Sequence, residues 1–167
     1  FKQGDWLTAK PSRFLGKWLR RTDVCMEMWH DRAYMMNVLH EVGLQAVQKT
    51  VGSPKLGDVT PLTAEEKQMW EEPLGHSQHH AFRRAVGQLR YILPERFDLA
   101  YSVWMLSRDL AQPTYQSWAR RRRLCRYLAG TLDLRLELSQ GSSRSLQIEV
   151  YVDSDFAGDK VTRKSVS

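Results

Sequence analysis

The C-terminal part of the chain shows the hydrophobic period of a β-strand. Apolar residues in 146–152 alternate with polar ones, which is the period of two expected for a strand with one buried face. The same alternation runs through 132–138, and the loop-like stretch 139–145 between the two is rich in glycine and serine. The pattern predicts two antiparallel strands joined by this loop.

A less regular alternation near the N-terminus predicts a β-hairpin within residues 12–29. Its first strand would cover 14–20 and its second 24–29, with the turn at Thr22 and Asp23.

Apolar residues at helical spacing follow the hairpin and fill the middle of the chain. The first helix would begin after Asp31, a favourable N-cap, and end at Gly43. Four more helices are predicted in 63–131. The pair Thr63 and Glu66 is a capping box for a short helix that runs through Trp70, and Ser77 is the predicted N-cap of the next helix. Asp98 lies in the first turn of the third helix. Thr114 caps the fourth, which ends at Gly130.

Glycine and proline between the first two helices indicate a linker. We therefore expect four units: 1–50, the linker 51–62, the helical unit 63–131 and the C-terminal unit 132–167. The predicted fold class is α+β, with an N-terminal β-hairpin and helix, a central helical bundle, and C-terminal antiparallel strands.

Three carboxylates follow the last predicted strand. Asp153 lies at the strand end, and Asp155 and Asp159 come next in a segment that contains Gly158. Oxygen donors of this kind suit Mg²⁺. An aspartate-rich turn after a strand is more often only a turn, because aspartate and glycine are favoured there.

A resemblance to a known protein family favours the Mg²⁺ site over an ordinary turn. The run YVDSDFAGD, followed by TRKSVS, resembles the start of the ribonuclease H domain in copia-type retrotransposon polyproteins, where Y-x-D-A-D-W-A-G-D precedes R-K-S-T-S. Asp153 occupies the position of the first catalytic aspartate. The resemblance implies that Asp153 and Asp155 bind Mg²⁺ in the complete protein, with Asp153 catalytic.

The resemblance continues in the same order along the chain. Residues 14–16 (FLG) match the segment just after the polymerase palm of this family. AFRRAVGQLRYIL at 81–93 is similar to Y-R-x-A-V-G-x-L-x-Y-L. The stretch 95–114 resembles T-R-P-D-I-A-Y-A-V-x-x-L-S-R-F-x-x-x-P-T, with Phe97 in place of proline. WARRRRLCRYLAGT at 118–131 resembles W-x-A-x-K-R-I-L-R-Y-L-K-G-T.

The resemblance implies a role for each predicted unit. Residues 1–50 would end the reverse transcriptase palm with a primer-grip-like hairpin, in which Leu15 and Gly16 contact nucleic acid. Residues 63–131 would form the thumb and connection, and 132–167 the incomplete start of a ribonuclease H-like sheet. The parent protein would be an RNA-directed DNA polymerase with ribonuclease H activity. Its partners would be a primer–template duplex or RNA–DNA hybrid and the rest of the Pol polyprotein.

We expect this chain alone to be inactive. It contains no Y-x-D-D polymerase motif, and no later carboxylate completes a two-metal site after Asp159.

Basic residues add a candidate phosphate-binding surface to a chain whose formal net charge is +6. On a helix over 115–130, four arginines fall outside the apolar arc and could neutralise phosphates without reading sequence: Arg120, Arg122, Arg123 and Arg126. The alternative is an ordinary solvated helix face. Arg121 falls inside the apolar arc, where it either extends along the core edge or pairs with an acid.

Cysteine usage and hydropathy bear on the compartment. Cys25 and Cys125 are far apart in apolar surroundings, which favours reduced thiols and an intracellular location, cytoplasmic or nuclear. No apolar run of membrane-spanning length occurs, so we expect no membrane partner.

Histidine and tryptophan residues offer two further sites that we expect to be structural. His76, His79 and His80 have helical spacing but no further ligand nearby, so no zinc site is predicted. Trp104 and Trp118 are expected to pack in the core rather than to stack on bases.

Two other functions remain open on the sequence. One is a non-catalytic, decayed retroelement remnant whose helical bundle binds a protein. The other is a small metal-dependent hydrolase built on Asp153, Asp155 and Asp159.

Overall fold

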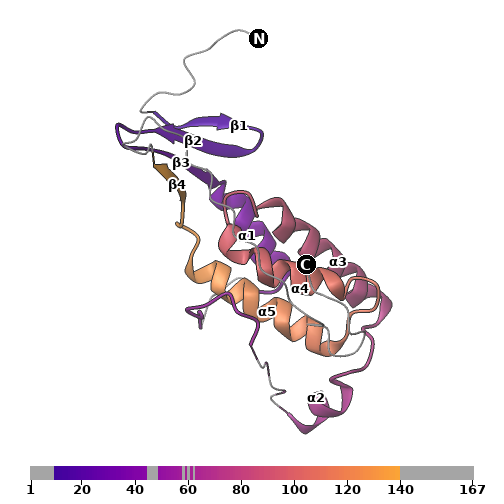
Figure 1. Cartoon of the computed structure of the whole chain (residues 1–167). Coiled ribbons are helices and arrows are strands. Elements are labelled where there is room, and N and C mark those ends of the chain that lie inside the picture. The colour runs from indigo at the N-terminus through magenta and orange to yellow at the C-terminus, as the bar shows by residue number, and fades with distance from the viewer. Residues whose placement is uncertain (1–9, 45–48, 58, 60, 62, 140–167) are drawn as a thin grey trace, which may run out of the picture.

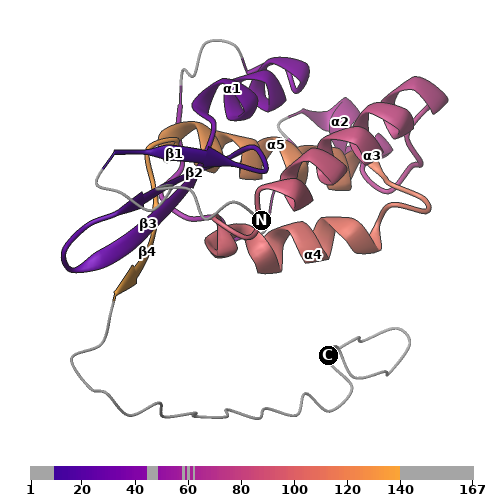
Figure 2. The same cartoon turned by 90° about the horizontal axis from the view of Figure 1, so that it is seen from above.

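The computed structural model describes residues 10–44, 49–57, 59, 61 and 63–139. A four-stranded antiparallel sheet lies at one end of a helical body, as Figures 1 and 2 show. The predicted α+β fold class is confirmed. The expectation that the C-terminal strands begin a ribonuclease H-like sheet depends on 140–167, which lie outside the described residues.

The sheet has the order β1-β2-β3-β4, and each neighbouring pair is antiparallel. Its strands are β1 (Ser12–Phe14), β2 (Lys17–Arg21), β3 (Cys25–His30) and β4 (Leu136–Ser139). β4 comes from the far end of the described chain and pairs with β3, an arrangement that local sequence patterns do not predict.

The predicted hairpin is confirmed with one change. In the turn between β2 and β3, the Thr22 amide and hydroxyl both donate to the Cys25 carbonyl, and the Cys25 amide donates to the Thr22 hydroxyl. The predicted strand 14–20 is instead divided, because Leu15 and Gly16 both have positive φ (49° and 80°) and form a second tight turn between β1 and β2.

At the other end of the described chain, the strand expected over 132–138 begins only at Leu136. Residues 131–133 form a turn, in which the Leu134 amide donates to the carbonyl of Thr131. The expected partner strand 146–152 lies outside the described residues.

Five α-helices are described: α1 (Arg32–Glu41), α2 (Ala64–Met69), α3 (His76–Tyr91), α4 (Ala100–Arg108) and α5 (Tyr115–Gly130). Asp31 caps α1 by accepting from the Ala33 amide, as predicted. Thr114 caps α5, also as predicted. Thr114 and Ser117 form a capping box, in which the Thr114 hydroxyl accepts from the Ser117 amide and the Ser117 hydroxyl accepts from the Thr114 amide.

Two predicted helix starts were wrong. Gly75, rather than Ser77, is the N-cap of α3, because the first intrahelical bond runs from the His79 amide to the Gly75 carbonyl. Asp98 lies in a 3₁₀ turn, η1 (Phe97–Leu99), that precedes α4.

One hydrophobic core joins α1 to the later helices. Fully buried members of this core on α1, α3, α4 and α5 include Val38, Phe82, Val86, Leu106, Leu124 and Leu128.

Residues 49–57, which we call the strap, cross the helices and add Leu56 to this core. Hydrogen bonds hold the strap: Ser102 donates to the Pro54 carbonyl at 2.7 Å, and Arg123 donates to the Lys55 carbonyl at 2.9 Å. Gly130 lets Thr50 pack closely, since a Cβ on Gly130 would lie 2.9 Å from the Thr50 Cβ.

Candidate nucleic-acid interface

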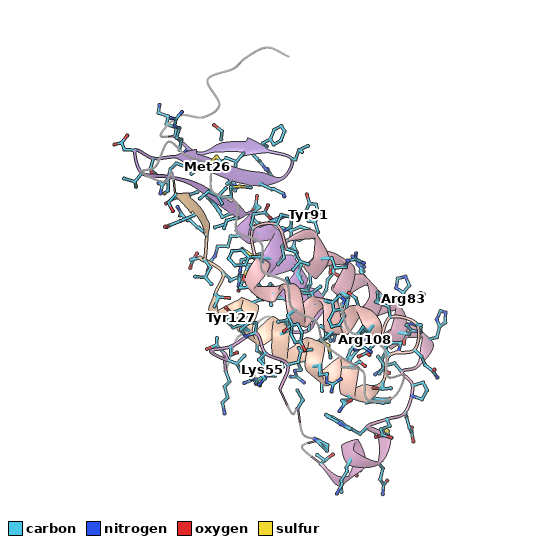
Figure 3. All side chains as sticks on the ribbon, in the orientation of Figure 1. Met26, Lys55, Arg83, Tyr91, Arg108 and Tyr127 are labelled. Carbon is cyan, nitrogen blue, oxygen red and sulfur yellow. The ribbon has the colours of Figure 1, made fainter. Side chains whose placement is uncertain are left out.

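The turn between β1 and β2 presents the FLG segment at one end of the molecule. Leu15 is 74% exposed. The Tyr91 hydroxyl donates to the Leu15 carbonyl at 3.3 Å, and Figure 3 shows Tyr91 at the end of the helical body that faces the sheet. A Cβ on Gly16 would lie 2.8 Å from the Tyr91 hydroxyl oxygen, so the close approach that this glycine permits within the chain is that of Tyr91.

A row of cations and indoles crosses one face of the sheet. Trp18 and Trp29 are cross-strand partners whose rings lie 6.4 Å apart and nearly parallel. Arg13 lies 5.9 Å from the Trp18 ring centre, and Arg135 lies 4.4 Å from that of Trp29. This row was not predicted from the sequence. The strand pattern around the two tryptophans could have suggested it, but only the cross-strand register brings the four groups together.

The four α5 arginines divide into two pairs. Arg122 is exposed and Arg120 half-buried. Arg123 and Arg126 donate through Nε to the carbonyls of Lys55 and Lys49. Two of the predicted phosphate ligands therefore also anchor the strap.

Arg121 takes neither of its two predicted positions. It is 2% exposed, and its guanidinium lies 3.6 Å from the centre of the Trp118 ring. Within the described part of the chain, no carboxylate pairs with it, and its Nε has no partner. Burial lowers the pKa of Arg121 to about 10 and raises that of the neighbouring Cys125 thiol to about 12.

An ion-pair network not foreseen from the sequence joins η1 to the end of α5. Arg96 is 2% exposed and donates two hydrogen bonds to Asp98, at 2.9 and 2.8 Å, and two more to Thr131. The Tyr127 hydroxyl also donates to Asp98. The R-x-D spacing at 96–98 is the signal that could have suggested this pairing.

The junction between sheet and helices is aromatic and polar. The His30 ring lies 4.7 Å from Tyr34 and 5.0 Å from Tyr91, centre to centre. Next to it, Lys17 Nζ lies 2.6 Å from a carboxylate oxygen of the buried Glu95. Burial lowers the pKa of His30, although the charge of Glu95 opposes the shift.

The predictions for tryptophan had mixed outcomes. Trp118 packs against the core, as expected. The prediction for Trp104 was wrong: it is 37% exposed, because Val103 and Leu106 fill the buried face of α4. Trp104 lies beside Tyr101, and with Phe97 the two form an exposed stripe along η1 and α4.

The remaining candidates give no metal site in the described part of the chain. No group of three possible metal ligands occurs there, and His79 instead hydrogen-bonds the Leu110 carbonyl. Both cysteines are free; Cys125 is buried and Cys25 half-buried. Asp153, Asp155 and Asp159 lie outside the described residues. Among the described helices, none has the length and apolar character needed to cross a bilayer.

Comparison with known proteins identifies the relatives of the chain. It is 42% identical over 78 residues to the retrovirus-related Pol polyprotein from transposon RE2 of Arabidopsis thaliana, and 30% identical over 162 residues to that from transposon TNT 1-94 of Nicotiana tabacum. Homologues of this chain are Pol polyproteins of copia-type transposons. The resemblance to Pol polyproteins of copia-type transposons is thereby confirmed. No family model matches the chain, and no solved structure does.

The chain corresponds to a small part of these Pol polyproteins. The match covers 47% of this chain and 5% of the RE2 polyprotein, and 92% of this chain and 11% of the TNT 1-94 polyprotein. The chain is also 36% identical over 84 residues to secreted RxLR effector protein 161 of Plasmopara viticola, a match that covers 50% of this chain and 58% of the effector.

Proposed function

We propose that this chain is the part of a retrotransposon Pol polyprotein that holds a primer–template duplex or RNA–DNA hybrid between the polymerase and ribonuclease H centres. The observation that carries the proposal is the exposed β1–β2 turn. It projects Leu15 and the Gly16 backbone from the sheet while Tyr91 fixes its conformation. A rigid, backbone-exposing turn suits contact with a sugar–phosphate chain.

Arginines supply the charge that such a duplex requires. Arg120 and Arg122 make no hydrogen bond or ion pair with the described residues, so their guanidinium groups are available for phosphates. Arg123 and Arg126 retain N–H groups beyond the Nε that binds the strap. Contacts of this kind would give affinity without sequence preference.

The proposal extends to metal chemistry only in the complete polyprotein. There, Asp153 and Asp155 would hold Mg²⁺ at the start of ribonuclease H, with Asp153 catalytic. In a chain extended through the ribonuclease H region, Asp153→Asn should abolish RNA cleavage and leave DNA synthesis nearly intact. Retained RNA cleavage by this folded variant would contradict the assignment.

Binding of the chain to an RNA–DNA hybrid at several salt concentrations tests the duplex proposal. Affinity should fall steeply with salt, and the double variant Arg120→Gln/Arg122→Gln should lower the log–log slope by about 1 to 2, because each lost phosphate contact removes nearly one released counterion. The loss should be similar for hybrids of different sequence.

Lys67→Gln is the matched control, because Lys67 is an exposed cation on α2, which Figure 1 places at the far end of the molecule from the sheet. Its slope should equal that of the unmodified chain. No measurable hybrid binding, or an unchanged slope in the double arginine variant, would overturn the proposal.

The second candidate is a protein-binding module derived from a retroelement. The observation that favours it is the exposed aromatic stripe, in which Phe97 and Tyr101 are 66% and 69% exposed. The similarity to a secreted effector protein agrees with a chain of this type acting outside a Pol polyprotein. Absence of salt-sensitive hybrid binding, combined with loss of a protein complex in Tyr101→Ser, would favour this candidate.

A further inference from the structure

We propose that a cavity beneath the β1–β2 turn binds an unpaired nucleobase. The cavity has a volume of about 580 Å³, enough for one base with its sugar. Its walls include Arg13, His30, Asp31, Tyr34, Asn37 and Tyr91, which come from β1, β3, α1 and α3. The inference rests on the proposed function, since the strand end that supplies the base would belong to the bound nucleic acid.

His30 is the first argument for a ligand. The residue is 3% exposed, and neither ring nitrogen makes a hydrogen bond of good geometry with the described residues. The Asp31 backbone and the Glu95 carboxylate lie near enough to affect its pKa but do not complete such a bond. Buried polar groups are nearly always paired, so an orphaned imidazole calls for a partner. Burial lowers the pKa of His30, which keeps the ring neutral, with one N–H donor and one acceptor nitrogen.

The walls favour an aromatic ligand. Tyr34 and Tyr91 are 5.3 Å apart between ring centres, and each ring also contacts the imidazole, at 4.7 and 5.0 Å. Tyr91 is 47% exposed and lines the cavity together with His30, so a ligand in the cavity would lie beside both rings. A planar heterocycle could then stack on the tyrosines and pair with the imidazole.

The charges of the walls favour a neutral ligand group. Arg13 and Asp31 form an ion pair of 3.4 Å across the cavity rim and offset each other. The amide of Asn37 adds a donor and an acceptor at the rim. An uncharged ring with donors and acceptors on its edge fits these groups, whereas a phosphate would face the Asp31 carboxylate. A nucleobase has this chemistry, whether it belongs to a free nucleoside or to a strand end.

Three RNA–DNA hybrids of equal duplex length test the proposal: one blunt, one with a three-nucleotide 3′ overhang, and one with the same overhang lacking bases. The overhang with bases should bind about tenfold tighter than the other two, as expected for stacking of one base. His30→Phe should remove this gain. It keeps a buried aromatic ring and removes both nitrogens, so the fold is preserved.

Tyr91→Ala should also remove the gain, whereas His80→Ala, the loss of an exposed aromatic ring on the same helix, should retain it. A retained gain in His30→Phe would overturn the proposal. In a separate arm, adenosine alone should shift the His30 imidazole NMR signals in the unmodified chain. Ribose 5-phosphate should not shift them. A shift with adenosine but no overhang gain would support the cavity with free nucleosides as its ligand, and no adenosine shift together with no gain would overturn it.

Binding of the blunt hybrid separates this inference from the proposed function. A blunt hybrid that binds, with no gain from bases in the overhang and no adenosine shift, overturns only the cavity. A hybrid that does not bind, with an adenosine shift, overturns the duplex proposal and supports the cavity.

Discussion

The guanidinium of Arg121 lies 3.6 Å from the centre of the Trp118 ring, in the same helix and without a carboxylate partner in the described part of the chain. The contact compensates a buried charge by a cation–π interaction. Such contacts contribute about 2 kcal/mol when desolvated, whereas removing a charge from water costs several kcal/mol.

Arg121→Met should therefore leave the free energy of unfolding unchanged or raise it by about 1 kcal/mol, because methionine fills the space without a charge. Urea denaturation measures this change. Arg122→Met, at an exposed site, is the control and should stay within about 0.5 kcal/mol. A loss of more than about 1 kcal/mol in Arg121→Met would show that the cation is needed for stability.

Asp98→Asn should destabilise the fold by about 3 kcal/mol at neutral pH, because it leaves the buried Arg96 charge without its counterion. Burial raises the pKa of Asp98, but the hydrogen bonds and charge of Arg96 outweigh it, and the pKa lies below its usual 3.8. The stabilisation of the fold by the ionised Asp98 carboxylate is complete above pH 3.8, the pKa in the unfolded chain. It is lost as the pH falls through the lower pKa of the folded state.

Acid titration of stability should therefore show a smaller loss between pH 5 and pH 2 for Asp98→Asn than for the unmodified chain. Tyr127→Phe removes one hydrogen bond to the same carboxylate and should cost about 1 kcal/mol. Equal acid sensitivity of Asp98→Asn and the unmodified chain would argue against the network.

His30 should make the protein less stable below pH 6.5. Burial lowers its pKa in the folded state, so the unfolded chain binds the proton more readily. The free energy of unfolding is then not reduced by His30 above pH 6.5. Below that pH it falls by up to about 1.4 kcal/mol per pH unit, until the pKa of His30 in the folded state is reached. Thermal unfolding at pH 7.5 and 5.5 should show this loss in the unmodified chain and not in His30→Phe. The exposed His80→Gln is the control and should behave like the unmodified chain.

Gly16→Ala should destabilise the β1–β2 turn by about 1 to 2 kcal/mol, because φ is +80° there and a Cβ would lie 2.8 Å from the Tyr91 hydroxyl. Adding Tyr91→Phe removes the close contact but not the backbone strain, so the double variant should not recover. Hydrogen exchange of the β1 and β2 amides measures the effect. Full recovery in the double variant would show that the hydroxyl contact alone makes glycine necessary.

Local signals in the sequence predicted the elements whose ends depend on nearby residues. The caps at Asp31 and Thr114 are examples, because a side chain bonds an amide two or three positions away. The buried stripe of α3 also followed from helical spacing.

Features that depend on distant segments could not be predicted in this way. The pairing of β4 with β3 and the cation–indole row require the register of the whole sheet. The exposure of Trp104 depends on which apolar residues of α4 the other helices cover. For the candidate site, Leu15 and Gly16 were singled out by the family resemblance, but within a strand rather than in the turn that they form. The hydrogen bonds by which Arg123 and Arg126 hold the strap were not foreseen.

The strap has a consequence for synthesis on the ribosome. Arg126 binds the carbonyl of Lys49 across 77 positions of the chain, and α1 shares its core with α5. A nascent polypeptide in which α1 and the strap have left the ribosome therefore lacks the surface on which both must pack until α5 emerges. The early segments remain open to chaperones and proteases during that interval, and the helical body closes only when translation has passed Gly130.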